Sequence, residues 1–260
     1  MIVIDNIHKY FGGFKAVDGT SLEIKKNSIT GLIGPNGAGK TTLFNVIAGI
    51  YKPTSGKVYL DNEDITDLPP HKLFEKGVLR TFQIPHEFST MSVMENLMMV
   101  PGSQTGEKLF NTWFNTSKIS DEEKEIKSKA IEVTKFLTID HLLYEKAGKL
   151  SGGQKKLLEL GRTMMVDAKR VLLDEVGAGV NRTLLKTIGD AILRLNKERG
   201  YTFCMIEHDM DFITKLCDPV IVLAEGKVLA EGKISDIKQN EEVIEAYIGK
   251  GMKNIPKRND

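Results

Sequence analysis

The stretch that most constrains the fold of this 260-residue chain is a glycine-rich segment that matches G-x-x-x-x-G-K-[ST]. Its residues are Gly34, Pro35, Asn36, Gly37, Ala38, Gly39, Lys40, Thr41 and Thr42. The apolar run before it is typical of a buried strand, and the residues after it have the apolar spacing of a helix. Loop N–H groups and a helix dipole together attract phosphate, Lys40 would reach the β- and γ-phosphates, and Thr41 would ligate Mg²⁺. We therefore predict a nucleotide site, with a glycine turn that binds nothing as the alternative.

Composition limits the classes of protein to which this chain can belong. A hydrophobic content of 41% is enough for the core of one large α/β domain. The net charge of +1 creates no overall field toward nucleic acid or lipid, so we expect no nucleic-acid partner. Cys204 and Cys217 are scattered thiols, which indicates a reducing compartment. No apolar run approaches the ~20 residues of a spanning helix, so we expect a soluble chain that reaches a membrane through a partner.

Polar residues that can act on a triphosphate follow three strand-like runs. Gln83 ends one run, Asp174 and Glu175 end a second, and His208 follows a third. The carboxyl ends of parallel strands face the ligand crevice, where Gln83 could contact Mg²⁺ or the attacking water and Asp174 would bind the Mg²⁺ shell. Glu175 would orient or deprotonate that water, and His208 would lie beside the developing phosphate charge. Each of these residues, taken alone, is also explained as an ordinary loop or surface residue.

A second anion site is predicted where a serine and two glycines open a helix. Ser151, Gly152, Gly153 and Gln154 precede apolar residues at helical spacing. The serine hydroxyl can cap the helix, and the glycines leave backbone N–H groups open to a ligand. A plain loop or a glycine cap is the alternative for this segment.

Aromatic residues and methionines leave two questions open. Phe11 could stack on a purine with Val17 packed beside it, or it could be a core aromatic of a β-layer. Four methionines at 91–99 favour core packing over an adaptable docking surface. The irregular, aromatic-containing stretch 101–118 indicates a functional loop, and a helix is predicted to begin with Ser120 as its N-cap.

The order of these motifs resembles the nucleotide-binding domain of ABC transporters, and the Leu-Ser-Gly-Gly-Gln signature is specific to that superfamily. The resemblance implies an ATP hydrolase that works as a head-to-tail dimer with two ATP molecules between the subunits. The phosphate loop of one subunit would face the Ser151 segment of the other. Phe11 would stack on adenine and Glu175 would be the general base. His208 would sense the γ-phosphate, and Gln83 would couple Mg²⁺ to the partner.

The fold that the resemblance implies is an α/β P-loop NTPase with an antiparallel β-subdomain and an α-helical subdomain. Residues 1–249 would form one ABC ATPase domain. Within it, 1–83 and 167–249 would form the RecA-like core with the β-subdomain, and 84–166 the helical subdomain that carries the signature. Residues 250–260 would be a flexible tail.

Finer features resemble the ATP-binding subunit of branched-chain amino-acid importers. These are Arg80-Thr81-Phe82-Gln83, Glu207-His208-Asp209-Met210 and Ala246-Tyr247-Ile248-Gly249. The implied partners are membrane permease subunits, a second ATPase of the same or a homologous kind, and indirectly a substrate-binding protein. The implied location is cytoplasmic, on the inner face of the cell membrane through the permease. Urea import, lipopolysaccharide export and a non-transport role such as Fe–S assembly scaffolding are the alternatives.

Two positions depart from the usual family pattern. Val176 stands where a proline normally follows the glutamate, which loosens the backbone after Glu175. Asn181 stands where an aspartate is commoner, which affects the expected cross-dimer contact of that loop. We expect ATPase activity to survive, because Glu175 and Asp174 are both present.

Overall fold

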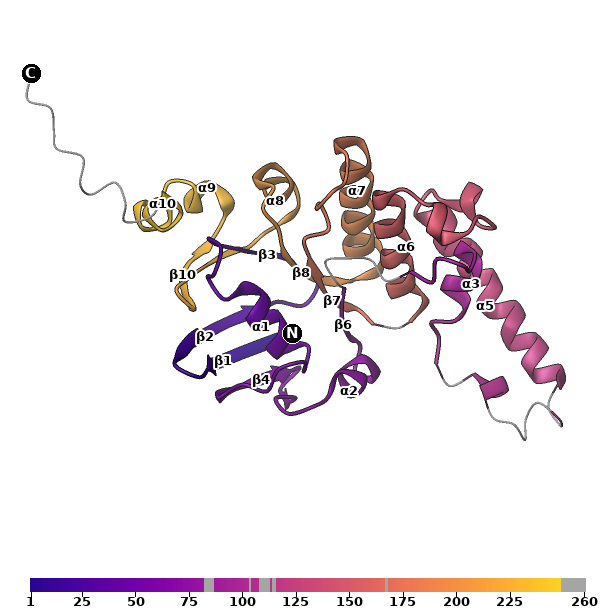
Figure 1. Cartoon of the computed structure of the whole chain (residues 1–260), viewed down its shortest axis with the longest axis horizontal. Helices are drawn as coiled ribbons and strands as arrows, with labels where there is room; N and C mark the ends of the chain where they lie inside the picture. The colour runs from indigo at the N-terminus through magenta and orange to yellow at the C-terminus, as the bar shows by residue number, and fades with distance from the viewer. Residues whose placement is uncertain (82–86, 103, 108–112, 114–115, 167, 249–260) are drawn as a thin grey trace, which may run out of the picture. The chain divides into compact units, whose positions relative to one another are not determined.

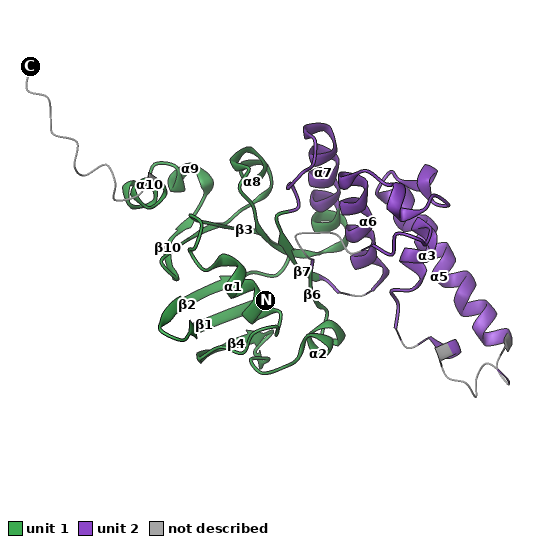
Figure 2. Cartoon of the chain, viewed as in Figure 1, with its two compact units in different colours: residues 1–80, 170–175, 195–260 green, residues 81–169, 176–194 purple. Residues whose placement is uncertain are grey.

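The computed structural model separates into two compact units, which are coloured in Figure 2. It describes residues 1–81, 87–102, 104–107, 113, 116–166 and 168–248. Unit 1 comprises residues 1–80, 170–175 and 195–260, and unit 2 comprises 81–169 and 176–194, so that the division falls within helix α7 (Arg182–Arg199). Within the described ranges, no helix has the length and apolar character needed to cross a membrane.

A six-stranded sheet with the order β10-β9-β3-β8-β7-β6 organises unit 1. Its strands are β3 (Ile29–Ile33), β6 (Val78–Arg80), β7 (Arg170–Asp174), β8 (Thr202–Ile206), β9 (Val220–Ala224) and β10 (Lys227–Gly232). All neighbours pair in parallel except β9 and β10, which form an antiparallel hairpin. Every residue of β3 and β8 is buried, as expected for parallel strands that are covered on both faces.

A second, antiparallel sheet of unit 1 has the order β2-β1-β4-β5. Its strands are β1 (Ile2–Phe11), β2 (Phe14–Ile24), β4 (Ser55–Leu60) and β5 (Glu63–Asp64). The turn between β1 and β2 is the Gly12-Gly13 break, where Gly12 has a φ of 57°. The first 33 residues therefore form strands β1, β2 and β3, with a tight turn between β1 and β2.

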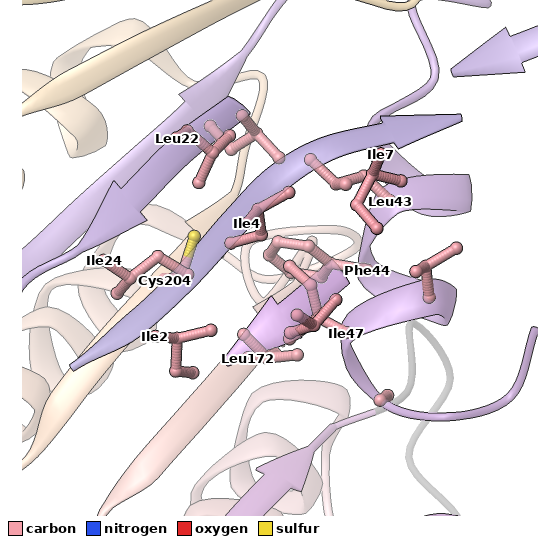
Figure 3. Packing of buried hydrophobic residues seen from close by; sticks show 14 of the residues in the cluster. Ile2, Ile4, Ile7, Leu22, Ile24, Leu43, Phe44, Ile47, Leu172 and Cys204 are labelled. Atoms are coloured by element: carbon pink, nitrogen blue, oxygen red, sulfur yellow. The ribbon is translucent and has the colours of Figure 1, made fainter. Parts of the chain in front are cut away.

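Helix α1 (Lys40–Ile47) is packed into the main core of unit 1 by its apolar face. Figure 3 shows Phe44 and Ile47 of this helix among Ile4 of β1 and Leu172 of β7. Phe44 and Ile47 are at most 1% exposed, so burial of these side chains fixes the helix along its length. The N-terminus of α1 is thereby held at the carboxyl end of β3, where the glycine-rich loop lies.

The remaining helices of unit 1 are short. They are α2 (Pro70–Glu75), α8 (Met210–Leu216), α9 (Ile234–Ile237) and α10 (Glu241–Ile248), which Figure 1 labels along the chain. Helix α2 begins at Pro70, and proline suits the first turn of a helix. The predicted tail at 250–260 lies outside the described residues.

Unit 2 is built from helices. They are α3 (Val93–Met98), η1 (Thr105–Glu107), α5 (Thr116–Phe136), η2 (Asp140–Leu142), η3 (Ala147–Lys149), α6 (Gly152–Met165) and the first part of α7. The methionine cluster is divided between two environments, because Met94 is buried and Met99 is 44% exposed. Phe110 and Phe114 of the predicted functional loop lie outside the described residues, and Trp113 is exposed.

The predicted start of one helix in unit 2 is wrong. Ser120 was expected to be an N-cap, but α5 begins at Thr116 and Ser120 lies inside it. A serine acts as an N-cap only when it directly precedes the first turn of a helix. Ile119 continues the apolar spacing to which Ile126 belongs, so the helical pattern extends upstream of Ser120. The carboxylate of Glu122, which lies inside α5, accepts a hydrogen bond from the N–H of Thr105 at 2.8 Å.

Candidate functional site

The glycine-rich loop joins β3 to α1 in a form that two of its glycines make possible. Gly39 is the N-cap of α1 with a φ of 95°, and a Cβ on it would lie 2.2 Å from the carbonyl oxygen of Ala16. A Cβ on Gly34 would lie 2.0 Å from the carbonyl oxygen of Leu223. Among the residues that the structure describes, no side chain caps the start of α1, so its first N–H groups are open to an anion.

Lys40 lies inside this loop and is only 7% exposed. Its ammonium group donates hydrogen bonds to the carbonyl oxygens of Gly34 at 2.7 Å and Pro35 at 3.0 Å. Burial lowers the pKa of Lys40, while the nearby negative charges of Glu175 and Asp174 act in the opposite direction. The cation is therefore oriented by the loop and is close to both acidic residues.

The turn between β9 and β10 is hydrogen-bonded to the glycine-rich loop. The carbonyl oxygen of Gly226 accepts hydrogen bonds from the N–H of Asp18 at 2.8 Å and from the hydroxyl of Thr20 at 2.7 Å. The N–H of Gly226 donates to the carbonyl oxygen of Ala38 at 3.2 Å. One glycine therefore ties strand β2 of the antiparallel sheet to the phosphate loop, a link that sequence reasoning did not find.

The predicted acidic pair and the histidine lie at the carboxyl ends of neighbouring strands. Asp174 ends β7, where it pairs with Ile206 at the end of β8, and His208 follows β8. The Nε2 atom of His208 lies 3.0 Å from an oxygen of the Glu175 carboxylate. Glu175 itself has a left-handed φ of 50°, and its N–H donates to the carbonyl oxygen of Ile206 at 2.9 Å. The strand ends therefore converge as the parallel topology predicts.

A pocket of about 240 Å³ unites these groups. It is lined by Phe14, Ala16, Asn36, Gly37, Ala38, Gly39, Lys40, Thr41, Thr42, Glu175 and His208. Phosphate-binding N–H groups, a cation, a carboxylate and an imidazole thus face one cavity. This combination suits the binding and hydrolysis of a phosphate anhydride.

Phe11 and Val17, the two residues predicted to contact a purine, and Phe14, which lies beyond the same turn, have different surroundings. Phe11 is 45% exposed and meets the ring of Tyr51 edge to face, with centroids 5.5 Å apart. The ammonium of Lys9 lies 5.1 Å from the centroid of the Phe11 ring. Val17 is fully buried in the core, whereas Phe14 is 63% exposed and lines the pocket. Sequence reasoning did not single out Phe14, although it lies in the same glycine turn as Phe11.

Asp174 has a partner that the sequence did not indicate. One of its oxygens, Oδ2, accepts a hydrogen bond from the guanidinium of Arg80 at 2.6 Å, and both side chains are almost completely buried. A basic residue near the end of a short strand carries no local signal that it will pair with an acid far along the chain. Gln83, the third predicted strand-end residue, lies outside the described residues.

The donor set suits Mg²⁺ bound together with a phosphate. In the described part of the chain, no cluster of three or more His, Cys, Asp or Glu side chains is placed to hold a metal ion by itself. Mg²⁺ is usually held by one or two protein oxygens, with water and substrate phosphates completing its shell. The Thr41 hydroxyl, which lines the pocket, and the buried carboxylate of Asp174 are oxygen donors of this kind.

In unit 2, the signature segment forms the N-terminus of α6, as predicted. Ser151 is the N-cap: its hydroxyl accepts a hydrogen bond from the N–H of Gln154, and the Gln154 side chain accepts one from the N–H of Ser151 at 2.9 Å. Ser151 and Gly152 are exposed, and Gly153 is buried beside Leu184. This capping box orders the helix start and leaves Gly152 accessible to a ligand.

The departure at Asn181 has a local explanation. Its side-chain oxygen accepts a hydrogen bond from the N–H of Leu184 at 2.9 Å at the start of α7. Asparagine and aspartate cap helices about equally well, so the local role survives this replacement. Val176 is buried, with 6% of its surface exposed.

These features define the class of protein. A P-loop ATPase has a phosphate loop and acidic residues at the end of a neighbouring strand, and this chain has both. The presence of one mainly parallel and one antiparallel sheet also fits this class. Residues 17–178 match the family model described as ABC transporter, and the chain therefore belongs to the ABC transporter family.

Known proteins are similar to this chain over nearly its full length. A relative from Archaeoglobus fulgidus, named probable branched-chain amino acid transport ATP-binding protein LivG, is 43% identical over 94% of this chain and 93% of its own length. A solved ATP-binding cassette of an ABC transporter in its ADP conformation has a TM-score of 0.82 and 41% identity, and the match covers 96% of this chain and 98% of that one. A dimeric cassette in a post-hydrolysis state with ADP and Pi has a TM-score of 0.73 and 25% identity over 90% and 99%.

Proposed function

We propose that this chain binds ATP with Mg²⁺ and hydrolyses it to drive a membrane permease that imports branched-chain amino acids. The observation that carries the proposal is the pocket in which the phosphate loop faces Glu175 and His208. The substrate class rests on the name of the Archaeoglobus relative, which matches along almost the whole chain.

Each side chain of the proposed site has a distinct role. Lys40 and the first N–H groups of α1 bind the β- and γ-phosphates, and Phe11 stacks on adenine. Glu175 accepts the proton of the attacking water, while His208 holds that carboxylate through their 3.0 Å contact. Thr41 and Asp174 would hold Mg²⁺, for which Gln83 is proposed as a further ligand, and the metal would neutralise charge on the transferred phosphoryl group.

The active form in this proposal is a head-to-tail dimer. The exposed N-terminus of α6, with Ser151 and Gly152, would be a second phosphate-binding element, and it would face the phosphate loop of the partner subunit. The dimeric relative in its ADP and Pi state supports a dimer of cassettes. The partner ATPase is a second copy or a homologue.

The chain would act at the cytoplasmic face of the cell membrane, attached there by the permease subunits. A substrate-binding protein would deliver the amino acid on the other side. ATP-driven closing and hydrolysis-driven opening of the dimer would supply the motion that the permease follows.

The hydrolytic part of the proposal is tested with Glu175→Gln, which removes the base and keeps the size of the side chain. We expect ATP affinity to remain within about threefold while turnover falls by about 10²–10⁴-fold, the usual contribution of a general base. Light scattering in ATP should show the dimer accumulating. Glu125→Gln, on an exposed part of α5, is the matched control and should behave as the original chain. Unchanged turnover in Glu175→Gln would remove Glu175 from this role.

The transport part is tested in membranes from the source cell. A tagged chain should co-isolate with permease subunits, and deleting its gene should abolish uptake of labelled leucine. Expression of the original chain should restore uptake, and expression of Glu175→Gln should not. Recovery with soluble Fe–S assembly proteins, with leucine uptake intact in the deletion strain, would contradict the transport function and favour the scaffold alternative.

A further inference from the structure

The buried guanidinium of Arg80 lies beside the carboxylate of Asp174, which is the proposed Mg²⁺ ligand. Arg80 is the last residue of β6, next to β7 in the sheet, and its guanidinium donates a hydrogen bond to Oδ2 of Asp174 at 2.6 Å. Its other terminal nitrogen donates to the side-chain oxygen of Asn45. Only 9% of the Arg80 side chain and 6% of the Asp174 side chain are exposed. Residues from β6, β7 and α1 thus meet at one charge pair in unit 1.

Stability alone does not account for this arrangement. A buried ion pair is often no more stabilising than a well-packed apolar pair of the same volume. Within the described part of the chain, the buried Nε of Arg80 lacks a hydrogen-bond partner, which makes the arrangement costlier still. A buried pair of this kind is therefore explained by what the charge does at the neighbouring site.

The pair of Arg80 and Asp174 is linked to two elements that line the pocket. Asn45 belongs to α1, the helix that begins with Lys40 and Thr41. Asp174 directly precedes Glu175, which lines the pocket. The guanidinium binds Oδ2, so it fixes the orientation of the carboxylate without occupying Oδ1. A fixed positive charge behind a carboxylate also lowers the attraction of that carboxylate for a second cation.

We propose that Arg80 is a positioning residue that acts through Asp174: it holds and neutralises the carboxylate while no metal is bound, and it thereby weakens the hold of the site on Mg²⁺. This inference rests on the proposed function, because it assumes that the nucleotide binds together with Mg²⁺. A site with this counter-ion stays ordered when it is empty and releases the metal readily after each turnover.

The test compares the dissociation constant of ADP in EDTA with that in excess Mg²⁺. ADP is the probe because it binds without being hydrolysed. In Arg80→Met, the unopposed charge of Asp174 repels free ADP and attracts the Mg²⁺ complex, so the ratio of the two constants should rise by at least about tenfold. Arg80→Lys keeps the charge, and its ratio should stay within about threefold of the original chain.

A second readout needs no nucleotide. The thermal midpoint of Arg80→Met should fall, because the buried carboxylate has lost its partner, and adding Asp174→Asn should restore most of the loss. A merely structural role for Arg80 would lower the midpoint and leave the Mg²⁺ ratio unchanged, which would overturn the inference. If Arg80→Met does not fold, Arg80→Gln, which also removes the charge but keeps polar hydrogen-bonding atoms, should raise the ratio by at least about tenfold, and an unchanged ratio would overturn the inference equally.

The original chain separates this inference from the proposed function. If its own ADP affinity is the same in EDTA and in Mg²⁺, the metal site fails and the inference fails with it. If the original chain prefers the Mg²⁺ complex and Arg80→Met shows the same preference, only the role of Arg80 is refuted.

Discussion

The two adjacent glycines of the signature segment should respond in opposite ways to a methyl group. A Cβ on Gly153 would lie 2.1 Å from Cδ2 and 2.5 Å from Cγ of Leu184, and 3.0 Å from Cγ1 of Val180. A Cβ on Gly152 would have as its nearest neighbour the carbonyl oxygen of Gly179, at an ordinary contact distance of 3.7 Å. Both glycines lie in the first turn of α6, so their backbone effects are similar.

The magnitude follows from these distances. Replacing a helical glycine by alanine stabilises a chain by about 0.5–1 kcal/mol, which is the expected result for Gly152→Ala. In Gly153→Ala the same gain is opposed by overpacking, which typically costs about 1–3 kcal/mol. The two variants should therefore differ by about 1–3 kcal/mol in the free energy of unfolding. For a chain of this size, that corresponds to roughly 2–12 °C between their thermal midpoints.

The assay is thermal unfolding followed by circular dichroism, with the original chain as the reference. Leu184→Ala in the Gly153→Ala background should recover part of the loss, because it removes the side chain that the new methyl group displaces. The coupling between the two changes should exceed about 0.5 kcal/mol. Equal midpoints for Gly152→Ala and Gly153→Ala would refute the packing explanation for the second glycine.

Three further outcomes are expected. Lys40→Met should weaken ATP binding about 10–100-fold in equilibrium titrations, because a charge-assisted contact contributes about 1.5–3 kcal/mol; unchanged affinity would contradict the phosphate role. Hydrogen bonds from Thr66 lower the pKa of Asp64 to about 2, so its contribution to stability is complete above about pH 4 and is lost as the pH falls through 2. Asp64→Asn should therefore flatten the acid dependence of the urea midpoint between pH 4 and 2, and parallel curves would disprove this. Burial raises the pKa of the Cys204 and Cys217 thiols, the latter to about 12, so a thiol reagent at pH 8 should label both only after unfolding; rapid labelling of the native chain would be the contrary result.

The parts of the site that local patterns specify could be predicted from the sequence. The phosphate loop depends on glycines and a lysine at fixed spacing, and the start of α6 depends on the N-cap Ser151 and the N3 residue Gln154. Asp174 and His208 could be placed because apolar strands that precede them end at one edge of a parallel sheet.

Other features depend on contacts between distant parts of the chain and could not be predicted. The pairing of Arg80 with Asp174 joins two strands that are neighbours only after the sheet has formed. The Gly226 turn reaches the phosphate loop in the same way. The wrong helix start that was predicted at Ser120 shows that a local pattern can also mislead. A serine at this position fits the rule for an N-cap, but α5 continues through it.

The place of β3 in its sheet has a consequence for synthesis of the chain. Its two neighbours, β8 and β9, are formed by residues 202–206 and 220–224, and the Gly226 turn follows them. The ribosome therefore releases the phosphate loop long before any of its lateral supports has been translated. Strands that must wait for remote partners pair slowly and stay exposed meanwhile. We expect nascent chains of this ATPase to acquire nucleotide affinity abruptly, once β9 and β10 have emerged, rather than gradually with length.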